Sequence, residues 1–251
     1  MDWPLSNLLE ELMARVETCQ PRRILFWGEE AEMVASYVAG WMAGRGLYVI
    51  VLDGANRFDP YMVSSIGRKM LIPAKTILKR ILIARAFTCY QMATLAGERV
   101  ISFVSEASHL SSETEGSPFS SRPNLILIGP LNTFLDEDVR EGEARVLFDR
   151  LLRRMEKMST KGFRFFMFQS DYPKSGFLPL NRWRINNREV GLETRKFYLM
   201  RRLFLFSDLV WKISLEDEKL KIVLDKDFIR NSALNLKQTV LGSRRIEYSN
   251  F

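Results

Sequence analysis

The chain has 251 residues, 47% of them hydrophobic and 27% charged, with a formal net charge of +7 and a pI near 9.5. This composition is ordinary for a globular protein with one substantial core. The longest apolar runs, such as residues 47–52 and 125–128, are strand-sized and far short of the ~20 residues that span a bilayer. The composition therefore excludes a membrane-spanning protein.

The two cysteines and the N-terminus indicate a reducing compartment. Cys19 and Cys89 are too few for a disulfide framework or a four-ligand zinc site, so we expect two inert thiols and no metal. The first residues contain neither a basic segment nor an apolar segment of the kind found in secretory signals. We therefore expect a cytoplasmic protein.

The first elements in chain order predict a helix followed by a β-α-β unit. Residues 5–16 have the apolar spacing of an amphipathic helix, so we expect residues 1–20 to form a lead-in helix before a single domain over 21–251. Residues 23–27 predict a buried strand ending at Gly28. A helix with Val34, Val38, Trp41 and Met42 on its apolar face follows, and residues 48–52 predict a second strand.

The same alternation continues to the end of the chain. We expect strands at 81–87, 125–128 and 163–168 and helices over 90–105 and 143–158. Residues 108–123 and 170–191 interrupt the alternation as exposed loops, and residues 209–215 and 219–224 predict an edge hairpin around an acidic turn. Continuous apolar strands alternating with helices predict an α/β fold, a mostly parallel sheet flanked by helices and ending in a C-terminal β-hairpin.

The segment after Gly28 stands where a phosphate-binding loop would lie. Such a loop needs glycines whose backbone N–H groups surround the phosphates, a lysine, and a Ser or Thr that holds Mg²⁺. Here Met33, Val34 and Ala35 stand where Gly-Lys-Ser/Thr would be required. Glu29, Glu30 and Glu32 also place negative charge near the start of the following helix, which opposes anion binding there.

Four segments together resemble the RecA/RadA-like recombinase ATPases, a P-loop NTPase family, and its archaeal and eukaryotic branch above all. Residues 48–60 (YVIVLDGANRFDP) are similar to the family's "yIDTEGTFRP" segment, and residues 81–92 (ILIARAFTCYQM) to its "nIxxARAyxxxHQM" segment. Residues 124–128 resemble the Walker B strand, and residues 165–169 the strand that ends in "NQ". The four matches occur in the family's order, so the resemblance implies a RecA-like core.

The resemblance also marks which catalytic groups are missing. Ala55 stands at the catalytic glutamate, Gly129 at the aspartate that supports Mg²⁺, and Gln169 at the family's polar switch position. Phosphoryl transfer depends on positioning and electrostatics, so losing these groups together leaves little to catalyse with. We therefore expect no ATP cofactor and no enzymatic activity: a pseudo-ATPase with a degenerate P-loop.

The loop over residues 170–191 is the candidate DNA-binding segment. The resemblance places it at the second of the two loops that hold single-stranded DNA in recombinases. Basic and aromatic side chains alternate in it, as backbone tracking and base stacking require; they are Lys174, Phe177, Arg182, Trp183, Arg184 and Arg188. The alternative is a solvated basic loop with its two aromatic rings packed inward.

The charge distribution gives one argument for DNA binding and one against it. Residues 161–202 contain ten basic and three acidic residues, a net charge of +7, to which the whole excess of the chain can be assigned. The first of the two family loops is acidic here, with Asp136, Glu137, Asp138 and Glu141, which argues against DNA.

The other residues that could suggest a catalytic, metal-binding or recognition role are expected to have structural roles instead. His109 is the one histidine, and we expect it on the surface of the Ser-rich loop. Asp53 follows a strand with no partner carboxylate in view, which favours a loop-capping role. Met33, Met42 and Met92 are expected to fill the core.

Three function hypotheses follow. The first is an accessory factor of DNA recombination or repair that binds single-stranded DNA or an active recombinase. The second is an interaction module that binds a short peptide of a partner protein without touching DNA, as the family docks aromatic-containing peptides on its core. The third is a nucleotide-dependent enzyme with an unusual site. Assembly as a homo-oligomer stays open.

Overall fold

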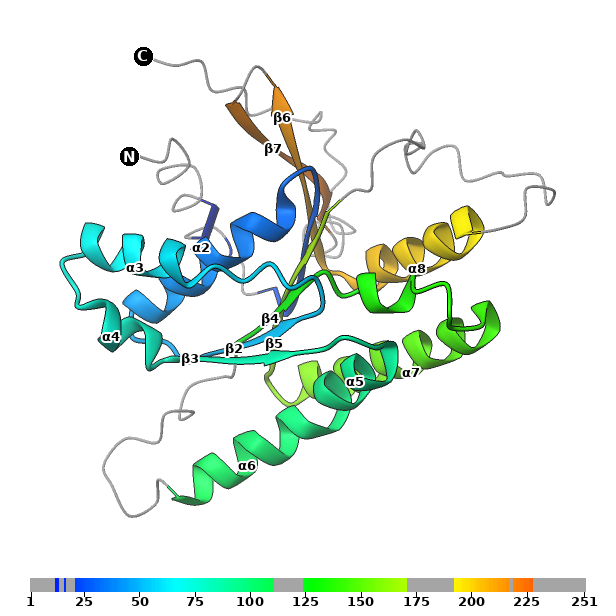
Figure 1. The fold of residues 1–251 in the computed structure, drawn as a ribbon, viewed down its shortest axis with the longest axis horizontal. Helices are drawn as coiled ribbons and strands as arrows, with labels where there is room; N and C mark the ends of the chain where they lie inside the picture. Colours follow the sequence, from blue (N-terminus) through cyan, green and yellow to red (C-terminus); the bar gives the residue numbers. More distant parts are fainter. Residues whose placement is uncertain are drawn as a thin grey trace, which may run out of the picture.

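The computed structural model describes residues 12, 13, 16, 21–110, 124–170, 192–216 and 219–227. Its centre is a seven-stranded sheet in the order β3-β2-β4-β5-β1-β6-β7, drawn in Figure 1. Neighbouring strands are parallel except for the antiparallel pair β6 and β7. The strands are β1 (Arg23–Gly28), β2 (Val49–Asp53), β3 (Ile81–Arg85), β4 (Asn124–Ile128), β5 (Arg164–Gln169), β6 (Leu209–Glu216) and β7 (Lys219–Asp227).

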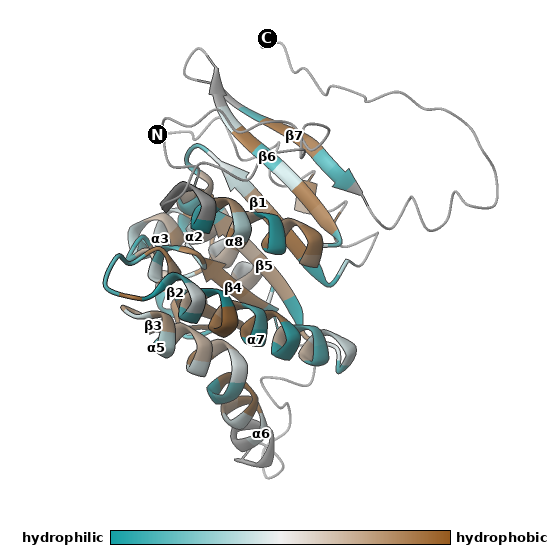
Figure 2. Ribbon diagram, turned by 90° about the vertical axis from the view of Figure 1, so that its right-hand side faces the viewer, coloured by the Kyte–Doolittle hydropathy of each residue, from teal (hydrophilic) through white to brown (hydrophobic). Residues whose placement is uncertain are grey.

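Helices cover both faces of this sheet (Figures 1 and 2). One face carries α2 (Ala31–Gly44), α3 (Pro60–Lys69) and α4 (Ala74–Leu78). The other carries α5 (Cys89–Thr94), the π-helical turn η1 (Leu95–Arg99), α6 (Val100–Leu110), the short 3-10 helix η3 (Asn132–Phe134), α7 (Glu141–Thr160) and α8 (Leu192–Phe206). The predicted α/β architecture is confirmed.

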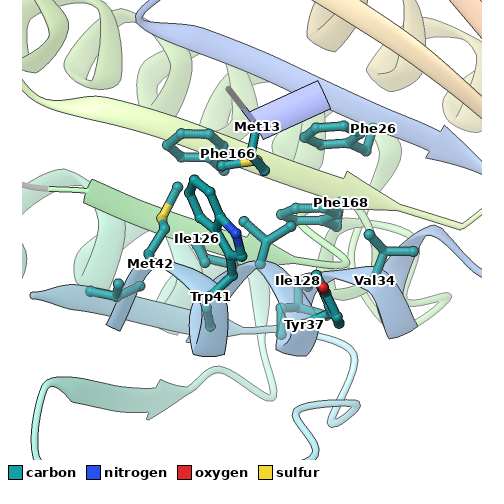
Figure 3. Packing of buried hydrophobic residues seen from close by; sticks show 14 of the residues in the cluster. Met13, Phe26, Val34, Tyr37, Trp41, Met42, Ile126, Ile128, Phe166 and Phe168 are labelled. Carbon is teal, nitrogen blue, oxygen red and sulfur yellow. The ribbon is translucent and has the colours of Figure 1, made fainter. Parts of the chain in front are cut away.

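Apolar side chains alternate between two cores because successive strand residues point to opposite faces. In β1, Ile24 and Phe26 pack beneath α2, whereas Leu25 and Trp27 pack on the side of α7 and α8. Figure 3 shows the first core, where the rings of Phe26 and Phe168 stack at a centroid distance of 4.8 Å. Burial on both faces explains why the central strands are continuous apolar runs.

Most predicted elements are confirmed within one to three residues. The described members of the lead-in helix, Leu12, Met13 and Val16, are helical and buried, and the rest of residues 1–20 lies outside the described part. All four residues predicted for the inner face of α2 are buried. The end of the predicted domain, beyond residue 227, lies outside the described residues.

Three helices were absent from the sequence prediction. Helix α3 begins with Pro60 at its first position, and the carboxylate of Asp59 accepts a hydrogen bond from the Tyr61 N–H at 2.8 Å. Helix α4 spans only five residues, and α8 begins directly after the long polar segment.

The loop prediction for residues 108–123 was wrong at its start, because α6 continues to Leu110. His109 therefore has a helical backbone and does not lie in a loop. Residues 111–123 lie outside the described part.

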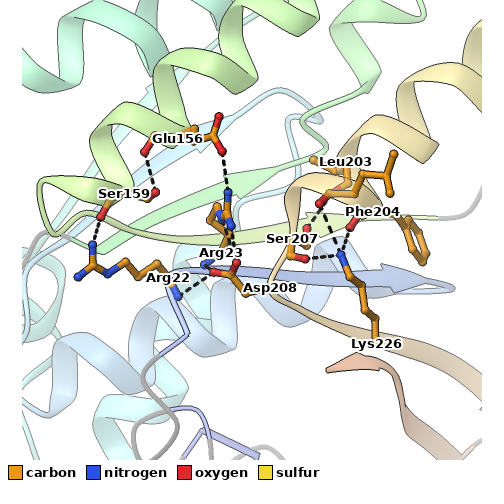
Figure 4. Close-up of polar contacts among 10 residues, drawn as sticks. Arg22, Arg23, Glu156, Ser159, Leu203, Phe204, Ser207, Asp208 and Lys226 are labelled. Carbon is orange, nitrogen blue, oxygen red and sulfur yellow. Dashed lines mark hydrogen bonds and ion pairs between the residues drawn. The ribbon is translucent and has the colours of Figure 1, made fainter. Parts of the chain in front are cut away.

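The C-terminal hairpin is tied to the parallel sheet by partly buried charges (Figure 4). Asp208, just before β6, accepts hydrogen bonds from the backbone N–H and the guanidinium Nε of Arg23, each at 3.0 Å. On β7, the ammonium of Lys226 donates to the carbonyl oxygens of Phe204 at 2.8 Å and Ser207 at 2.6 Å. Lys226 thus caps the carbonyl end of α8, and burial lowers its pKa.

Among the described helices, none has both the length and the apolar character needed to cross a membrane.

Candidate functional site

The four segments that resemble the recombinases end at the same edge of the sheet. The strands of these segments, β2, β3, β4 and β5, run parallel to one another and to β1, so their carboxyl ends lie at the same edge, which is where open α/β sheets bind ligands. Asp53 is in register with Ile128, and Trp27 with Gln169. We call this place the carboxyl-edge site; its residues are Glu32, Asp53, Ala55, Gly129, Asn132 and Gln169.

The connection from β1 to α2 is too short to form a phosphate cradle. Only Glu29 and Glu30 separate Gly28 from the first residue of α2. Glu30 has a left-handed backbone (φ 60°), and its carbonyl accepts hydrogen bonds from the N–H groups of Met33 at 3.0 Å and Val34 at 3.4 Å. These backbone donors are used inside the helix, where a phosphate-binding loop would present them to its ligand.

The side chains at the two positions where a phosphate-binding loop would have Lys and Ser/Thr are buried inside the protein. Val34 is 1% exposed and Ala35 is fully buried, both in the core between α2 and the sheet. Met33, which was predicted to fill the core, is 43% exposed, so that prediction was wrong, while Met42 and Met92 are buried as predicted. Met33 sits on the one side of α2 that the sheet and α3 leave open.

Glu32 does not face solvent as its two neighbours do. Glu29 and Glu30 are exposed, but Glu32 is only 6% exposed. Its Oε1 accepts hydrogen bonds from Asn132 Nδ2 at 3.3 Å and from the Ser170 N–H at 3.4 Å. Burial raises the pKa of the Glu32 carboxyl, and the hydrogen bond from Ser170 opposes that rise.

Gln169 continues this polar chain. It is 2% exposed, its Oε1 accepts from the Leu131 N–H at 2.9 Å, and its Nε2 donates to Asn132 Oδ1 at 3.0 Å. Glu32, Asn132 and Gln169 thus connect the start of α2, the loop after β4 and the end of β5. The resemblance pointed to Gln169 alone; Asn132 carried no sequence signal, because only the crossing of three loops gives it partners.

Asp53 has the loop-capping role predicted for it. Its Oδ1 accepts hydrogen bonds from the N–H groups of Ala55 and Arg57, each at 3.2 Å, and its Oδ2 accepts from the Phe58 N–H at 3.0 Å. Asp53 is 1% exposed, and Arg85 Nε lies 3.9 Å from Oδ2. With three backbone donors on it, this carboxylate organises the loop after β2.

Gly129 and Ala55 pack against each other where two carboxylates would be needed. Gly129 has φ 57°, a left-handed conformation that glycine adopts readily. A Cβ atom at position 129 would lie 2.6 Å from Ala55 Cβ and 2.7 Å from Asn132 Nδ2. An aspartate at position 129 would therefore collide with its neighbours as well as strain the backbone.

The candidate DNA-binding residues from Lys174 to Arg188 lie outside the described part of the chain. The structure does give the two ends of their segment, Ser170 after β5 and the start of α8. In the loop after β4, the acidic residues Asp136, Glu137 and Asp138 are exposed, whereas Glu141 is the first residue of α7.

Arg195, in the first turn of α8, is a site residue that the sequence did not single out. It is 4% exposed, and its Nη1 donates to the Val139 carbonyl at 2.9 Å. Its Nε and Nη2 are buried and have no hydrogen-bond partner among the described residues. Buried polar groups are nearly always satisfied, so Arg195 is an exception.

The cysteine and the metal-ligating side chains of the described residues form no second candidate site. Cys89 is buried, and burial raises the pKa of its thiol, consistent with an unreactive side chain; Cys19 lies outside the described residues. No three metal-ligating side chains gather anywhere in the described part.

No protein-family model matches the chain, and a search of curated proteins finds no match either.

Proposed function

We propose that this chain is a non-catalytic RecA/RadA-like protein that acts by binding other molecules, as an accessory factor of DNA recombination or repair. The observation that carries the proposal is the two-residue turn between β1 and α2. It leaves no loop to surround a triphosphate, and it directs Val34 and Ala35 into the core. Since phosphoryl transfer needs positioned cations and a metal, this edge offers no means to perform it.

Calorimetric titration with ATP tests this proposal directly. We expect no saturable binding at millimolar nucleotide, with or without Mg²⁺. A clear binding isotherm would overturn the non-catalytic assignment.

The outermost strand β3 supports binding of a short peptide. Among the described strands, β3 pairs only with β2 and is the first strand of the sheet. The Arg80 carbonyl accepts from the Val49 N–H and the Ala86 N–H donates to the Asp53 carbonyl, so even-numbered residues face β2. Because backbone groups alternate along a strand, Ile81, Ile83 and Arg85 turn their N–H and C=O groups outward. An extended peptide can pair with such a row.

The side chains at this edge suit an apolar partner. Ile83 is 46% exposed, and Phe87 and Tyr90 just beyond the strand are 68% and 48% exposed. Phe87 is held rigidly, because its N–H donates to Gln91 Oε1 at 2.8 Å while the Gln91 N–H donates to Thr88 Oγ1 at 3.2 Å. Exposed apolar residues beside an unpaired strand mark an interaction site.

Proline at position 83 tests this docking mode. Ile83→Pro removes an outward N–H and leaves the pairing of β3 with β2 intact, since proline is tolerated where the N–H faces away from the sheet. Peptides selected from a random library on the wild-type protein should lose binding to Ile83→Pro and keep binding to Met33→Ala, a change at another exposed apolar residue. Equal binding to both variants would exclude the β3 edge.

Single-stranded DNA is the second candidate partner. It is favoured by the position of the basic segment, which leaves the sheet at Ser170 beside the carboxyl-edge site and rejoins it at α8.

A further inference from the structure

A group of basic residues lies at the amino ends of the parallel strands, at the end of the sheet opposite the carboxyl-edge site. It gathers where α2 and α3 end and around α4. We call it the α3–α4 basic surface and define it by its six cationic residues: Arg45, Arg68, Lys69, Lys75, Lys79 and Arg80. All are exposed except Arg80, which is half-buried.

Packing between the helices brings these six residues together. A methyl group on Gly44, at the end of α2, would touch Met70 Cε at 2.9 Å and Ile77 Cδ1 at 3.7 Å. Met70 follows Arg68 and Lys69, and Ile77 lies between Lys75 and Lys79. Arg80 lies beside the end of α2, because its Nη1 donates a hydrogen bond to the Ala43 carbonyl at 3.1 Å. Figure 1 shows the α3–α4 connection at the left extremity of the molecule.

The charge of this surface is not balanced by described neighbours. Residues 45–80 contain seven basic and two acidic residues. Both acids lie at the other edge of the sheet, where Asp53 caps its own loop and Asp59 caps the start of α3. None of the six cations forms an ion pair with a described residue. The positive charge of the chain therefore has a second location besides residues 161–202.

We propose that the α3–α4 basic surface binds the phosphate backbone of double-stranded nucleic acid. Six cations on one surface supply the phosphate contacts that dominate such binding. Single strands also need exposed aromatic rings for stacking, and the described aromatic residues here do not provide them. Trp41 is 5% exposed beneath the Arg45 guanidinium, which lies 4.5 Å from its ring centroid, and Tyr48 is half-buried.

One apolar side chain projects from this surface and gives a control. Leu71 is 92% exposed and has φ 56°, a conformation that closes α3 through a hydrogen bond from the Ile72 N–H to the Gly67 carbonyl at 2.8 Å. Leu71→Gly keeps this closure and removes the side chain. Binding through phosphates alone leaves the affinity of this variant for a duplex unchanged.

The test measures binding of a labelled duplex oligonucleotide by fluorescence anisotropy over a range of salt concentrations. The variant Arg68→Gln, Lys69→Gln, Lys75→Gln should bind about tenfold or more weakly near 0.1 M salt, with the salt slope reduced by about one unit per lost contact. The control Arg150→Gln, Arg153→Gln, Lys157→Gln removes the same charge from exposed residues of α7. It should retain most of the affinity, and both variants should melt at the wild-type temperature.

Several results would overturn the proposal. The wild-type protein could fail to bind the duplex at low salt, or both triple variants could lose affinity equally. Loss of binding in Leu71→Gly would indicate an apolar contact. Binding to anionic lipid vesicles without binding to the duplex would indicate a membrane surface as the partner. Single-strand binding that depends only on residues 170–191 leaves this inference unaffected, because the duplex is expected to bind a different set of residues.

Discussion

Asn132 donates a hydrogen bond to the buried carboxylate of Glu32 across 3.3 Å. The same amide accepts from Gln169 at 3.0 Å, so a polar chain runs across the carboxyl ends of the central strands. Four predictions concern this edge and the segment that leaves it.

The buried carboxyl of Glu32 should make stability depend on pH. Because burial raises its pKa above the ordinary value of 4.5, its ionisation costs stability, and that cost grows as pH rises from about 4.5 through the folded-state pKa. Glu32→Gln keeps the accepting oxygen and removes the charge. We expect the variant to be more stable at neutral pH by about 1.4 kcal/mol for each unit of pKa elevation, and equal to wild type below about pH 4.

Urea unfolding of both proteins across this pH range measures the difference. A variant that is less stable at neutral pH would mean that the ionised form is favoured, with Arg57 as its nearest opposing charge.

Gly129 should tolerate no side chain. Gly129→Ala combines a left-handed backbone with a contact of 2.6 Å to Ala55 Cβ, so we expect a loss of about 2 to 4 kcal/mol in unfolding free energy. Gly46→Ala is the matched control, because its φ is 89° and nothing lies within 4 Å of the added carbon. It should lose only the backbone part, about 1 to 2 kcal/mol. Equal losses in denaturant unfolding would refute the collision between Gly129 and Ala55.

Introducing a lysine at position 34, where a phosphate-binding loop would have one, should not confer nucleotide binding. Val34→Lys places an ammonium group in the core beneath α2, which should destabilise the fold by roughly 3 kcal/mol or more. Met33→Lys, one residue away and exposed, should leave the melting temperature nearly unchanged. Calorimetry should detect no ATP binding by either variant; binding by Val34→Lys would show that the short turn can open.

The basic segment makes a prediction about single-stranded DNA that separates charge from stacking. Replacing Arg182, Arg184 and Arg188 with Ala should weaken binding and flatten its salt dependence by about one unit per lost contact. Trp183→Ala should reduce affinity by ~1 to 3 kcal/mol with an almost unchanged salt slope. Both quantities come from one oligonucleotide titration at several salt concentrations.

Thermal melting of the same variant tests the alternative for Trp183. A ring packed in the core would cost ~3 to 5 kcal/mol of fold stability when removed. A wild-type protein that ignores single strands even at low salt would remove the DNA hypothesis and leave peptide docking on β3.

The sequence by itself determined the α/β architecture, the order of most elements and the edge hairpin, because buried parallel strands are continuous apolar runs that stand out from helical periodicity. It also predicted the cap formed by Asp53, since the backbone N–H groups that this carboxylate accepts from lie within the next five residues of its own loop. Local interactions of this kind are visible in sequence.

Tertiary structure alone decided how distant residues meet. Glu32, Asn132 and Gln169 lie more than thirty residues apart in sequence and join only because three strand ends converge. The same holds for Met33, whose exposure depends on where α3 lies, and for the six cations around α4, which sequence scatters between Arg45 and Arg80. Burial and clustering follow from packing between elements, and a periodic pattern records only which face of an element is apolar.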